Sequence, residues 1–401
     1  MLIKNVSLLY GKDLEYLRNS SVSIDDNVFG KINTDKIASE GDVYDAEGLL
    51  MIPGLINAHT HIADSIAKDI ASEEGLYRRV HPVYGVKRAV LNESVKEHLI
   101  TYMQASVLSM LKRGITTFAD FREGGLGGIN LLKEAVTEMG IRHICLGRVE
   151  HYFNIESIQR DDDLPEEVIK DAETVVDASD GFGISGANEY SNKALGRFQK
   201  IAREHNKLLA IHAAESREVS DYSMKNFGKS ETSRIIEHLL PHFIIHMTNA
   251  SDSDLKAVAE KNIGIIVCPR ANGVLGGGIP KVASMMKHGC NVAIGTDNVM
   301  LNSPDLFREL DYLWKVSKAM ENNFISAREL VKMVTVNAAN ILKLDKLGYI
   351  DENMLADAVF IDTHSIDLDP MHDPYVAIVH RVNESSIKAV MIGGRFVHGS
   401  L

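Results

Sequence analysis

Cysteine is scarce in this sequence. The 401 residues include only three, Cys145, Cys268 and Cys290, which lie far apart in the chain and are odd in number. A disulfide framework needs pairs of cysteines, and a cysteine-rich zinc site needs several of them at short spacings. The sequence therefore argues against both, and it is typical of a protein that keeps its thiols reduced.

Long apolar runs and concentrated positive charge are also missing. No stretch approaches the roughly 20 uninterrupted apolar residues of a membrane span, and the N-terminus lacks the apolar run of a signal peptide. We therefore expect a cytoplasmic protein with no membrane partner. The 55 acidic residues outnumber the 43 basic ones, which gives a net charge of −12. Because nucleic-acid binders need clustered Lys and Arg, we expect no nucleic-acid partner, and a small-molecule substrate stays open.

Apolar residues make up 45% of the chain, enough for a substantial core. From residue 52 onward, short apolar runs alternate with longer amphipathic segments. The short runs predict buried parallel strands at Ile52–Ala58, Ile115–Ala119, Ile144–Val149, Phe182–Gly186, Leu208–Ile211, Phe243–Ile245, Ile263–Val267 and Val292–Gly295. The amphipathic segments predict helices at Glu93–Lys112, Pro165–Ala178, Asn192–His205, Asp252–Lys261 and Pro280–His288. Asn192 and Asp252 are the expected N-caps of two of them.

Eight strand-then-helix units in succession favour an α/β fold, a (β/α)8 TIM-like barrel over residues 53–346. The alternative is an open, doubly wound sheet. Residues 1–52 and 347–401 have a different texture, with short alternating strands such as Leu2–Leu9, Ala358–Asp362 and Ile387–Val397. We expect these two flanks to pair into one small β-sandwich formed by both chain termini.

The first predicted strand leads directly into His59-Thr60-His61. Side chains two residues apart on a strand point to the same side, so both imidazoles can reach one point. In a barrel that point lies at the carboxyl end of the strands, where the sites of this fold occur. A His-X-His pair alone is common, but here an apolar run delivers both rings to a place where an unpaired polar group is costly to bury. The pair therefore indicates half of a metal site.

Four more polar residues follow later predicted strands. His212 comes after the fifth strand, with Glu215 three residues further on, and His246 and Asp297 follow the sixth and eighth strands. Taken singly, each is equally typical of a loop histidine, a carboxylate at a helix start or an N-cap. Because the ends of barrel strands converge, their common position predicts one cluster. Histidine and aspartate ligands suit one catalytic Zn²⁺ or Fe²⁺ with a position left for water.

The combination resembles the amidohydrolase superfamily, in its branch of cytosine, guanine and S-adenosylhomocysteine/methylthioadenosine deaminases and triazine hydrolases. The matching stretches are Pro53–His61, Gly114–Asp120, Ile211–Glu215, Ile245–Thr248, and Cys268 through Asp297. The resemblance implies that the metal is bound by His59, His61, His212 and Asp297, and that Glu215 and His246 act on substrate and water. Binuclear members carry a carboxylated lysine after strand 4, where residues 182–188 here contain no lysine. We therefore expect one divalent metal ion.

The expected chemistry follows from these roles. We hypothesise that Asp297 takes a proton from the attacking water, that His246 orients that water, and that Glu215 protonates a ring nitrogen and then the departing amine. An amidine carbon becomes electrophilic only when its ring nitrogen is protonated, so an acid at residue 215 favours deamination. We predict a metal-dependent hydrolytic deaminase that replaces an exocyclic amine of a purine, pyrimidine or related heterocycle with oxygen. The alternatives are hydrolysis of a cyclic amide or a substituted triazine and, in another class, an inactive binding protein.

Weaker candidates for substrate contact follow strands 3, 4 and 7, where a surface salt bridge or a loop cap is equally typical: Arg148, His151, Asn188 and Arg270. Residues 75–87 predict a long loop that covers the site. The glycine clusters Gly124–Gly128 and Gly273–Gly278 lack the Gly-Lys-Ser/Thr ending of a phosphate-binding loop and predict flexible loops. The oligomeric state stays open, a homo-oligomer included.

Overall fold

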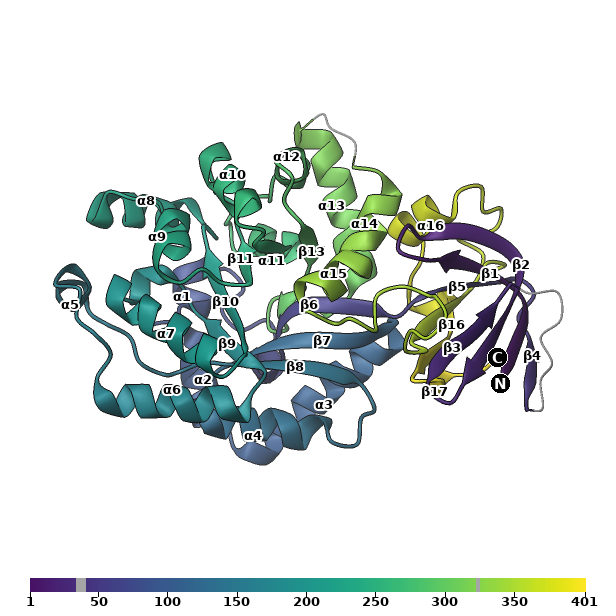
Figure 1. The fold of residues 1–401 in the computed structure, drawn as a ribbon, viewed down its shortest axis with the longest axis horizontal. Coiled ribbons are helices and arrows are strands. Elements are labelled where there is room, and N and C mark those ends of the chain that lie inside the picture. The colour runs from purple at the N-terminus through teal and green to yellow at the C-terminus, as the bar shows by residue number, and fades with distance from the viewer. Residues whose placement is uncertain (34–40, 322–324) are drawn as a thin grey trace.

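The computed structural model describes residues 1–33, 41–321 and 325–401. Two sheets organise these residues, one in the middle of the larger part of the molecule and one at its right-hand end in Figure 1. The parallel sheet contains β6 (Leu55–His61), β7 (Ile115–Arg122), β8 (Arg142–Gly147), β9 (Gly181–Ile184), β10 (Leu208–Ala213), β11 (Phe243–His246), β12 (Gly264–Val267), β13 (Val292–Ile294) and β14 (Asp297–Asn298). The second, which we call the terminal sheet, contains β1 (Leu2–Tyr10), β2 (Glu15–Asp25), β3 (Val28–Ile32), β4 (Val43–Asp45), β5 (Leu49–Pro53), β15 (Ala358–Asp362), β16 (Ile387–Ile392) and β17 (Arg395–Gly399).

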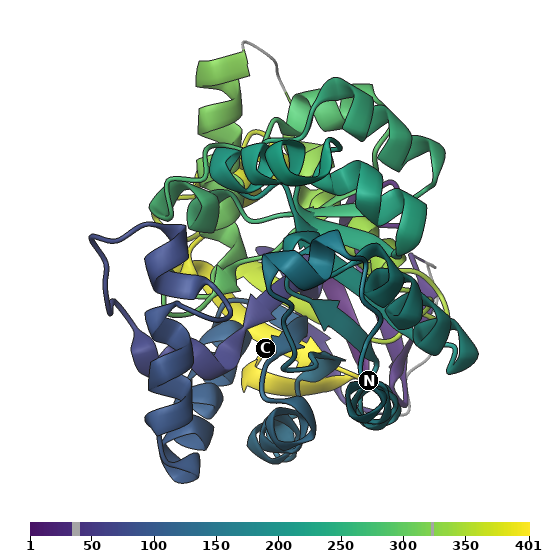
Figure 2. The ribbon, with the colours of Figure 1, turned by 90° about the vertical axis from the view of Figure 1, so that its left-hand side faces the viewer.

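The described residues also form helices, most of which lie around the outer side of the parallel sheet (Figures 1 and 2). They are α1 (Leu76–Val80), α2 (Val86–Glu93), α3 (Lys96–Lys112), α4 (Gly125–Val136), α5 (Ile155–Gln159), α6 (Glu166–Ala178), α7 (Asn192–Glu204), α8 (Arg217–Phe227), α9 (Glu231–His238), α10 (Asp252–Glu260), α11 (Pro269–Val274), α12 (Val282–Lys287), α13 (Leu306–Glu321), α14 (Ala327–Met333), α15 (Val336–Ile341) and α16 (Pro374–His380), with short 3₁₀ helices at Ile62–Ala67, Ala187–Glu189 and Glu384–Ser386. Within the described parts of the chain, no helix has the length and apolar character that crossing a membrane requires.

The parallel sheet is strongly curled. Its strands lie in chain order from β6 to β13, and β14, which follows β13 after two residues, pairs with β6 so that Asp297 lies opposite Thr60. The first and last strands are therefore neighbours. Gly295 permits this approach, because a Cβ at that residue would lie 2.6 Å from the Cβ of His59.

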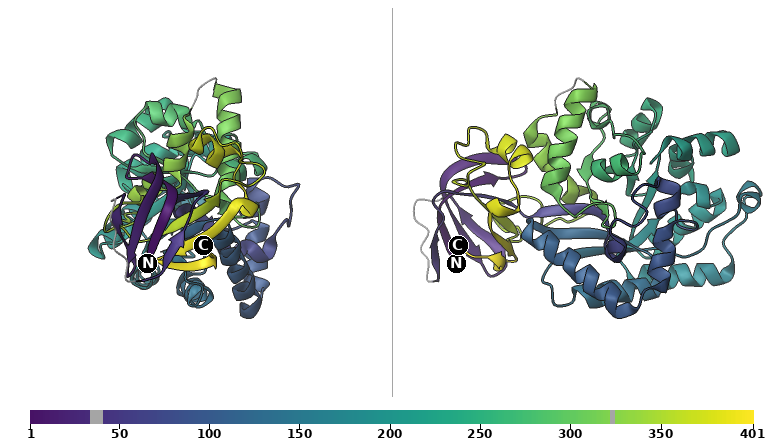
Figure 3. Two further views of the ribbon diagram at one scale, coloured as in Figure 1. Left: turned by 90° about the vertical axis from the view of Figure 1, so that its right-hand side faces the viewer. Right: turned by 180° about the vertical axis from the view of Figure 1, so that it is seen from behind.

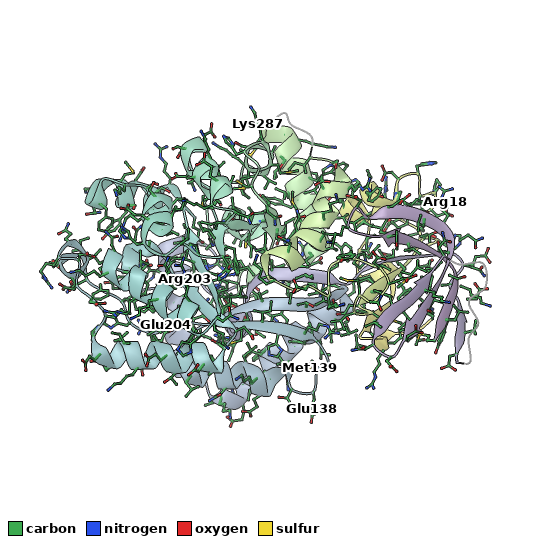
Figure 4. All side chains as sticks on the ribbon, in the orientation of Figure 1. Arg18, Glu138, Met139, Arg203, Glu204 and Lys287 are labelled. Atoms are coloured by element: carbon green, nitrogen blue, oxygen red, sulfur yellow. The ribbon has the colours of Figure 1, made fainter. Side chains whose placement is uncertain are left out.

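The strands of this sheet begin near the terminal sheet and end far from it. The start of β7 packs against β16, and the carboxyl ends point to the left in Figure 1 and toward the viewer in Figure 2. Arg18 on the terminal sheet and Arg203 and Glu204 at the end of α7 mark the two parts of the molecule (Figure 4). Polar residues that follow the strands therefore gather on the face remote from the terminal sheet.

The terminal sheet joins the two ends of the chain. β5 pairs with both β1 and β15, and the order of the main path is β17-β16-β15-β5-β1-β2-β3, with β4 beside β1. Its own core includes Ile3, Phe29 and Phe360, all fully buried. The two termini lie close together in it (Figure 3, left). Hydrogen bonds link all eight strands into a single sheet, so the expected pairing of the flanks is present, while the sandwich form stays a prediction.

One predicted strand covers parts of two observed strands. The run Ile52–Ala58 is divided at Gly54, because β5 ends at Pro53 in the terminal sheet and β6 begins at Leu55 in the parallel sheet. A Cβ at residue 54 would lie 2.3 Å from Thr116 Oγ1. The apolar run is continuous because both strands are buried, so its pattern does not mark the passage from one sheet to the other.

The predicted N-caps are wrong by one residue. Ser191 caps α7 and Ser251 caps α10, each through a hydroxyl that accepts a backbone N–H of the first turn. Serine and aspartate or asparagine are comparable N-caps, so adjacent candidates compete. Ser251 and Asp254 also form a reciprocal capping box, which decides the second case.

Three segments expected to be loops contain helix. Residues 75–87 hold α1 and the start of α2, and Gly125 begins α4 directly after Gly124, whose φ is +85°. Gly273 likewise lies in the short helix α11. A glycine before a helix supplies a left-handed turn, so these clusters start or interrupt helices instead of forming only flexible loops.

Candidate active site and metal centre

Four polar side chains meet where β6 and β10 end and β14 begins. The Nε2 atom of His59 lies 3.3 Å from Nε2 of His212 and 3.3 Å from Oδ1 of Asp297. Nε2 of His61 lies 3.7 Å from the same aspartate oxygen. The three imidazoles each present a nitrogen within 4.8 Å of the others. Alternation along β6 brings His59 and His61 to one side, and the curl of the sheet brings the other two strands to them.

The backbone is strained where two of the site residues stand. His246, at the end of β11, has φ +74°, and Asp297, at the start of β14, has φ +60°. Non-glycine residues in this left-handed region cost about 1–3 kcal/mol each and are held there by their surroundings, commonly at functional sites. The strain turns each side chain from the end of its strand toward the shared cavity, which both residues line.

Each imidazole has one nitrogen that faces the cluster and one that points away from it. The hydrogen-bond partner of the nitrogen that points away decides whether the nitrogen facing the cluster carries a lone pair. Burial lowers the pKa of His61 and of His212, which favours the neutral imidazole. Nδ1 of His212 is 2.9 Å from the carbonyl oxygen of Ile184, and Nδ1 of His61 is 2.7 Å from a carboxylate oxygen of Glu123. Both oxygens accept, so both Nδ1 atoms donate, and the Nε2 atoms keep lone pairs that face the cluster.

His246 has the opposite arrangement. Its Nδ1 lies 3.2 Å from Nδ2 of Asn272, an amide nitrogen that donates. The proton of this neutral ring is then on Nε2, 3.5 Å from Oε1 of Glu215. Burial lowers the pKa of His246 to about 4, so the ring is a neutral hydrogen-bond donor toward the cavity.

Two carboxyl groups in the cavity have opposite proton affinities. Burial, reinforced by the nearby charge of Asp297, raises the pKa of Glu215 well above its usual value. Burial works against ionisation of Asp297 too, but its contacts with His59 and the other imidazoles outweigh this and hold its pKa well below the usual value. One group is therefore available as an acid and the other as a base within one site.

Two cavities that share part of their lining lie at this face. The first, which we call the reaction chamber, has a volume of about 90 Å³ and is lined by His61, His212, Glu215, His246 and Asp297, among others. The second, which we call the side chamber, has a volume of about 490 Å³ and extends between α2, α3 and α4. Val80, His81, Pro82, Lys87 and Arg148 line both chambers.

Comparison with known proteins agrees with this geometry. The model of the amidohydrolase family matches residues 50–397, which is most of the chain. The chain belongs to the amidohydrolase family. An uncharacterized protein of Methanocaldococcus jannaschii is 38% identical over 368 residues, 90% of each chain. A 5-methylthioadenosine/S-adenosylhomocysteine deaminase of Acetivibrio thermocellus is 28% identical over 422 residues, 99% of this chain and 93% of that one.

Among solved structures, an adenosine deaminase of Xanthomonas campestris with bound zinc superposes on this amidohydrolase with a TM-score of 0.85. The match covers 98% of this chain and 92% of that chain at 18% identity. At this identity the likeness concerns the fold.

Several residues of the amidohydrolase site were not predicted from the sequence. Glu123 directly follows β7, and one of its carboxylate oxygens receives both His61 Nδ1 and, at 2.6 Å, the ammonium of Lys87 from α2. Arg122 holds its other oxygen at 2.5 Å. The position of Glu123 after a predicted strand was a usable signal. Lys87 gave none, because it reaches the site from a helix that sequence analysis expected to be a loop.

Two further carboxyl groups line the reaction chamber, Glu189 and Glu231. Glu231 accepts the backbone N–H groups of Ala187 and Ala214, which places it beside the ends of β9 and β10. Its position at the start of α9 resembles an ordinary helix terminus in the sequence, so nothing there pointed to the site.

The four weaker candidates are placed differently. Arg148 lines both chambers, whereas His151 lines a separate cavity between α4 and α6. Asn188 donates to the carbonyl of Val219, and Arg270 is held by Glu309 and by the loop around residue 302. Of these four, Arg148 is the residue that the structure brings to the reaction chamber.

Proposed function

We propose that this amidohydrolase is a metal-dependent hydrolytic deaminase, which replaces an exocyclic amine of a nitrogen heterocycle with oxygen and releases ammonia. The observation that carries the proposal is the carboxyl of Glu215, only 16% exposed and held protonated beside the Nε2–H of His246, in the same chamber as the ionised Asp297. Deamination needs an acid for the ring nitrogen and a base for water, and these residues supply both. The deaminase activity named for the Acetivibrio thermocellus relative supports the proposal.

The donor set fits one divalent cation such as Zn²⁺, with Fe²⁺ as the alternative. Ligands at 2.0–2.1 Å around a tetrahedral Zn²⁺ stand about 3.3 Å from one another. The separations of 3.3, 3.3 and 3.7 Å among His59, His61, His212 and Asp297 agree with this spacing. The lone pairs of His61 and His212 face the same point, since their other nitrogens donate to Glu123 and Ile184. These four residues would hold the metal, whose Lewis acidity lowers the pKa of water toward about 7.

The protein's own groups carry the protons. Asp297 accepts one proton from the water whose oxygen bonds to the ring carbon, and the Nε2–H of His246 donates a hydrogen bond to that oxygen. Glu215 gives its proton to the adjacent ring nitrogen. The proton on Asp297 and the remaining proton of the water then go to the amine and to Glu215, and the C–N bond breaks. Ammonia leaves, oxygen replaces the amine, and both carboxyl groups return to their starting states.

The organisation around this site completes the proposal. We infer a (β/α)8 barrel over residues 53–346 and a companion β-sandwich from residues 1–52 and 347–401. The ring of parallel pairings from β6 to β14 supports the first part, and the pairing of β5 with β15 supports the second. One metal per chain, a small-molecule substrate and a cytoplasmic location are further parts of the proposal.

Ammonia release tests the function directly. The zinc-loaded protein is incubated with adenine, guanine and cytosine, with their nucleosides and 5′-substituted nucleosides, and with cyclic amides and aminotriazines, and ammonia and ring-opened products are both measured. A deaminase releases ammonia from amino-heterocycles and leaves their rings intact. Ring opening without ammonia favours cyclic amide hydrolysis, and no turnover of any compound by the loaded protein favours a binding protein. Elemental analysis that finds two tightly bound metals per chain would contradict the single-metal site.

A further inference from the structure

We propose that Glu231 is a positioning residue for the general acid. Its buried carboxyl fixes the backbone that carries Glu215, and with Arg234 it fastens the segments after β9 and β10 to α9. The role of Glu215 in this inference rests on the proposed function, and the rest depends on the hydrogen bonds of α9. Neither Glu231 nor Arg234 takes part in the proton transfers described above.

Glu215 lies outside regular secondary structure. β10 ends at Ala213 and α8 begins at Arg217, so the hydrogen bonds of a strand or helix do not fix the residues between them. Ala214, directly before Glu215, has φ +49°. A non-glycine residue stays in this left-handed region only where its surroundings hold it. The direction of the Glu215 side chain therefore depends on what binds the backbone of residues 214 and 215.

Glu231 and Asn249 bind that backbone from two sides. Oε2 of Glu231 accepts the N–H of Ala214 at 2.9 Å. The carbonyl oxygen of Ala214 accepts the N–H of Asn249 at 2.8 Å. The Asn249 side chain also donates to the carbonyls of Glu215 at 3.2 Å and of Gly277 at 2.8 Å. Two residues from other parts of the chain thus hold the peptide groups next to the acid.

The other oxygen of Glu231 binds the segment after the neighbouring strand. Oε1 accepts the N–H of Ala187, which follows β9, at 3.2 Å. Arg234, one turn further along α9, donates to the carbonyls of Ala187 at 3.1 Å and of Tyr190 at 2.8 Å. Residues three apart on a helix lie on the same face, and Glu231 and Arg234 are 3% and 2% exposed. This face of α9 therefore joins the segments after β9 and β10.

An ordinary carboxylate at a helix start would have different partners. It would accept N–H groups of its own first turn or face solvent, where the helix dipole favours it. In α9 the hydroxyl of Ser230 has that task and accepts the N–H of Ser233. Both oxygens of Glu231 instead accept N–H groups from two other segments. Since burying a carboxyl costs free energy, its burial indicates that it serves those segments and not α9 itself.

The variant Glu231→Met removes both acceptors from a side chain of similar length. With the amino-heterocycle that the zinc-loaded wild type turns over fastest, we expect kcat to fall about tenfold or more, since a displacement of about 1 Å can cost about 100-fold. KM and metal content should stay nearly unchanged, because His212 lies on β10 itself. Glu231→Gln keeps one acceptor and should lose less. Glu237→Met, at an exposed ion pair with Lys229 on the same helix, is the matched control.

A double-mutant cycle shows whether Glu231 acts through Glu215. If it does, Glu231→Met causes little further loss of kcat in a Glu215→Gln background, because no acid is left to position. A merely structural role predicts the same loss in both backgrounds, and that result would overturn the inference. Asn249→Ala removes a different hydrogen bond to the same backbone and should show the same dependence on Glu215. It decides the question if Glu231→Met does not fold.

Hydrogen exchange tests the hydrogen bonds of Glu231 without turnover. In the folded, zinc-loaded Glu231→Met variant, the amides of Ala187 and Ala214 should exchange about fivefold faster, which corresponds to the net contribution of a typical hydrogen bond. Glu237→Met should leave both amides unchanged. Unchanged exchange of both amides in Glu231→Met would overturn the inference. Absence of ammonia release by the wild type, together with faster exchange in Glu231→Met, would instead contradict the proposed function and support the hydrogen bonds of α9.

Discussion

The two nitrogens of one imidazole have different tasks in this site, and the partner of the outer nitrogen decides the role of the inner one. His61 and His212 donate outward, to Glu123 and to the carbonyl of Ile184, and so turn lone pairs inward as metal ligands do. His246 accepts outward from Asn272 and so turns an N–H inward. A ring that presents N–H cannot bind a cation there, but it can stabilise negative charge on oxygen.

Asn272→Asp should invert the tautomer of His246. An aspartate at this position accepts, so the ring proton moves to Nδ1 and the inward hydrogen bond to oxygen is lost. We expect kcat to fall about 100-fold, the usual effect of removing one such donor. The ¹⁵N chemical shifts of the labelled histidine ring should exchange their assignments, which a merely structural role for Asn272 does not predict. Unchanged shifts in a folded variant would refute the assignment, and Asn291→Asp at the surface is the matched control.

Glu215→Gln should lower kcat by about 10²–10⁴-fold, the contribution of a positioned general acid, while the metal content stays unchanged. The amide fills the same space but has no proton of suitable acidity to give. Turnover with a substrate panel and metal content by elemental analysis are measured together, with Glu218→Gln on the exposed side of α8 as the control. Near-normal turnover with the metal retained would show that another residue is the acid.

The same carboxyl should determine the alkaline side of the pH profile. Glu215 acts in its protonated form, and burial raises its pKa well above the usual value, so the acid is present at neutral pH. Activity should be lost as the pH rises through that pKa, because the proton that the ring nitrogen needs is then gone. A kcat/KM profile that keeps rising on the alkaline side would contradict this order of protonation.

Among single residues, those that directly follow predicted strands could be located from the sequence. His59, His61, His212, His246 and Asp297 all stand at such positions, and the structure brings them together. Asn272 also follows a predicted strand, but its role as a donor to His246 depends on which side chain it meets in space. Lys87 follows no predicted strand, and its role likewise depends on the side chains that it meets. Arg270 shows the converse, because a position after a strand led to a buried ion pair with Glu309 outside the two chambers.

At the scale of elements, helix α2 lies over the site and is linked to the candidate metal centre through Lys87. Lys87 is 6% exposed, and its ammonium lies 2.6 Å from the Glu123 oxygen that also receives His61. It also lies 3.5 Å from the buried carboxylate of Asp64. One carboxylate oxygen thus joins a covering helix to a metal-binding histidine, so the position of α2 and the orientation of His61 depend on each other.

Lys87→Met should weaken both functions of this connection. Without the ammonium, α2 loses its ion pair with Glu123, and His61 loses the group that holds its partner in place. We expect metal affinity to fall about tenfold, the lower end of the effect of changing a group that orients a metal-binding histidine, and KM to rise. A chelator competition measures the first and initial rates measure the second. Lys170→Met on the exposed face of α6 is the control, and an unchanged metal affinity in Lys87→Met would contradict the connection.

The elements themselves were predictable where periodicity and length agreed. All eight predicted barrel strands lie where strands are found, because short apolar runs between amphipathic helical segments are typical of buried strands. The errors occur where no polar residue marks the boundary between two elements, or where glycines favour a loop by composition but begin a helix. At Gly54 the chain leaves one sheet for another inside a single apolar run, and at Gly124–Gly128 glycines begin a helix where their composition favoured a loop. Tertiary packing decided both cases.

At the scale of the whole molecule, the site joins parts of the chain that are remote in sequence. His59 and His61 lie on the first strand of the parallel sheet, His212 on the fifth, and Asp297 where the last segment returns to the first. The terminal sheet joins the beginning and end of the chain in a similar way, through β5. A ligand bound by all four residues therefore stabilises the arrangement of the complete sheet and not one element alone.

Removal of the metal should accordingly lower the thermal stability of the entire fold. Anything that binds only the native state stabilises it by RT ln(1 + [L]/Kd), about 4 kcal/mol at a thousandfold excess over Kd. For a chain of this length we expect chelation to lower the Tm by at least about 5 °C and readdition of Zn²⁺ to restore it. His212→Ala should have the lower Tm already and respond little to the chelator, whereas His205→Ala, at a surface pair with Asp177, should behave like the wild type. Equal Tm values with and without metal would mean that these residues do not form a metal site that spans the sheet.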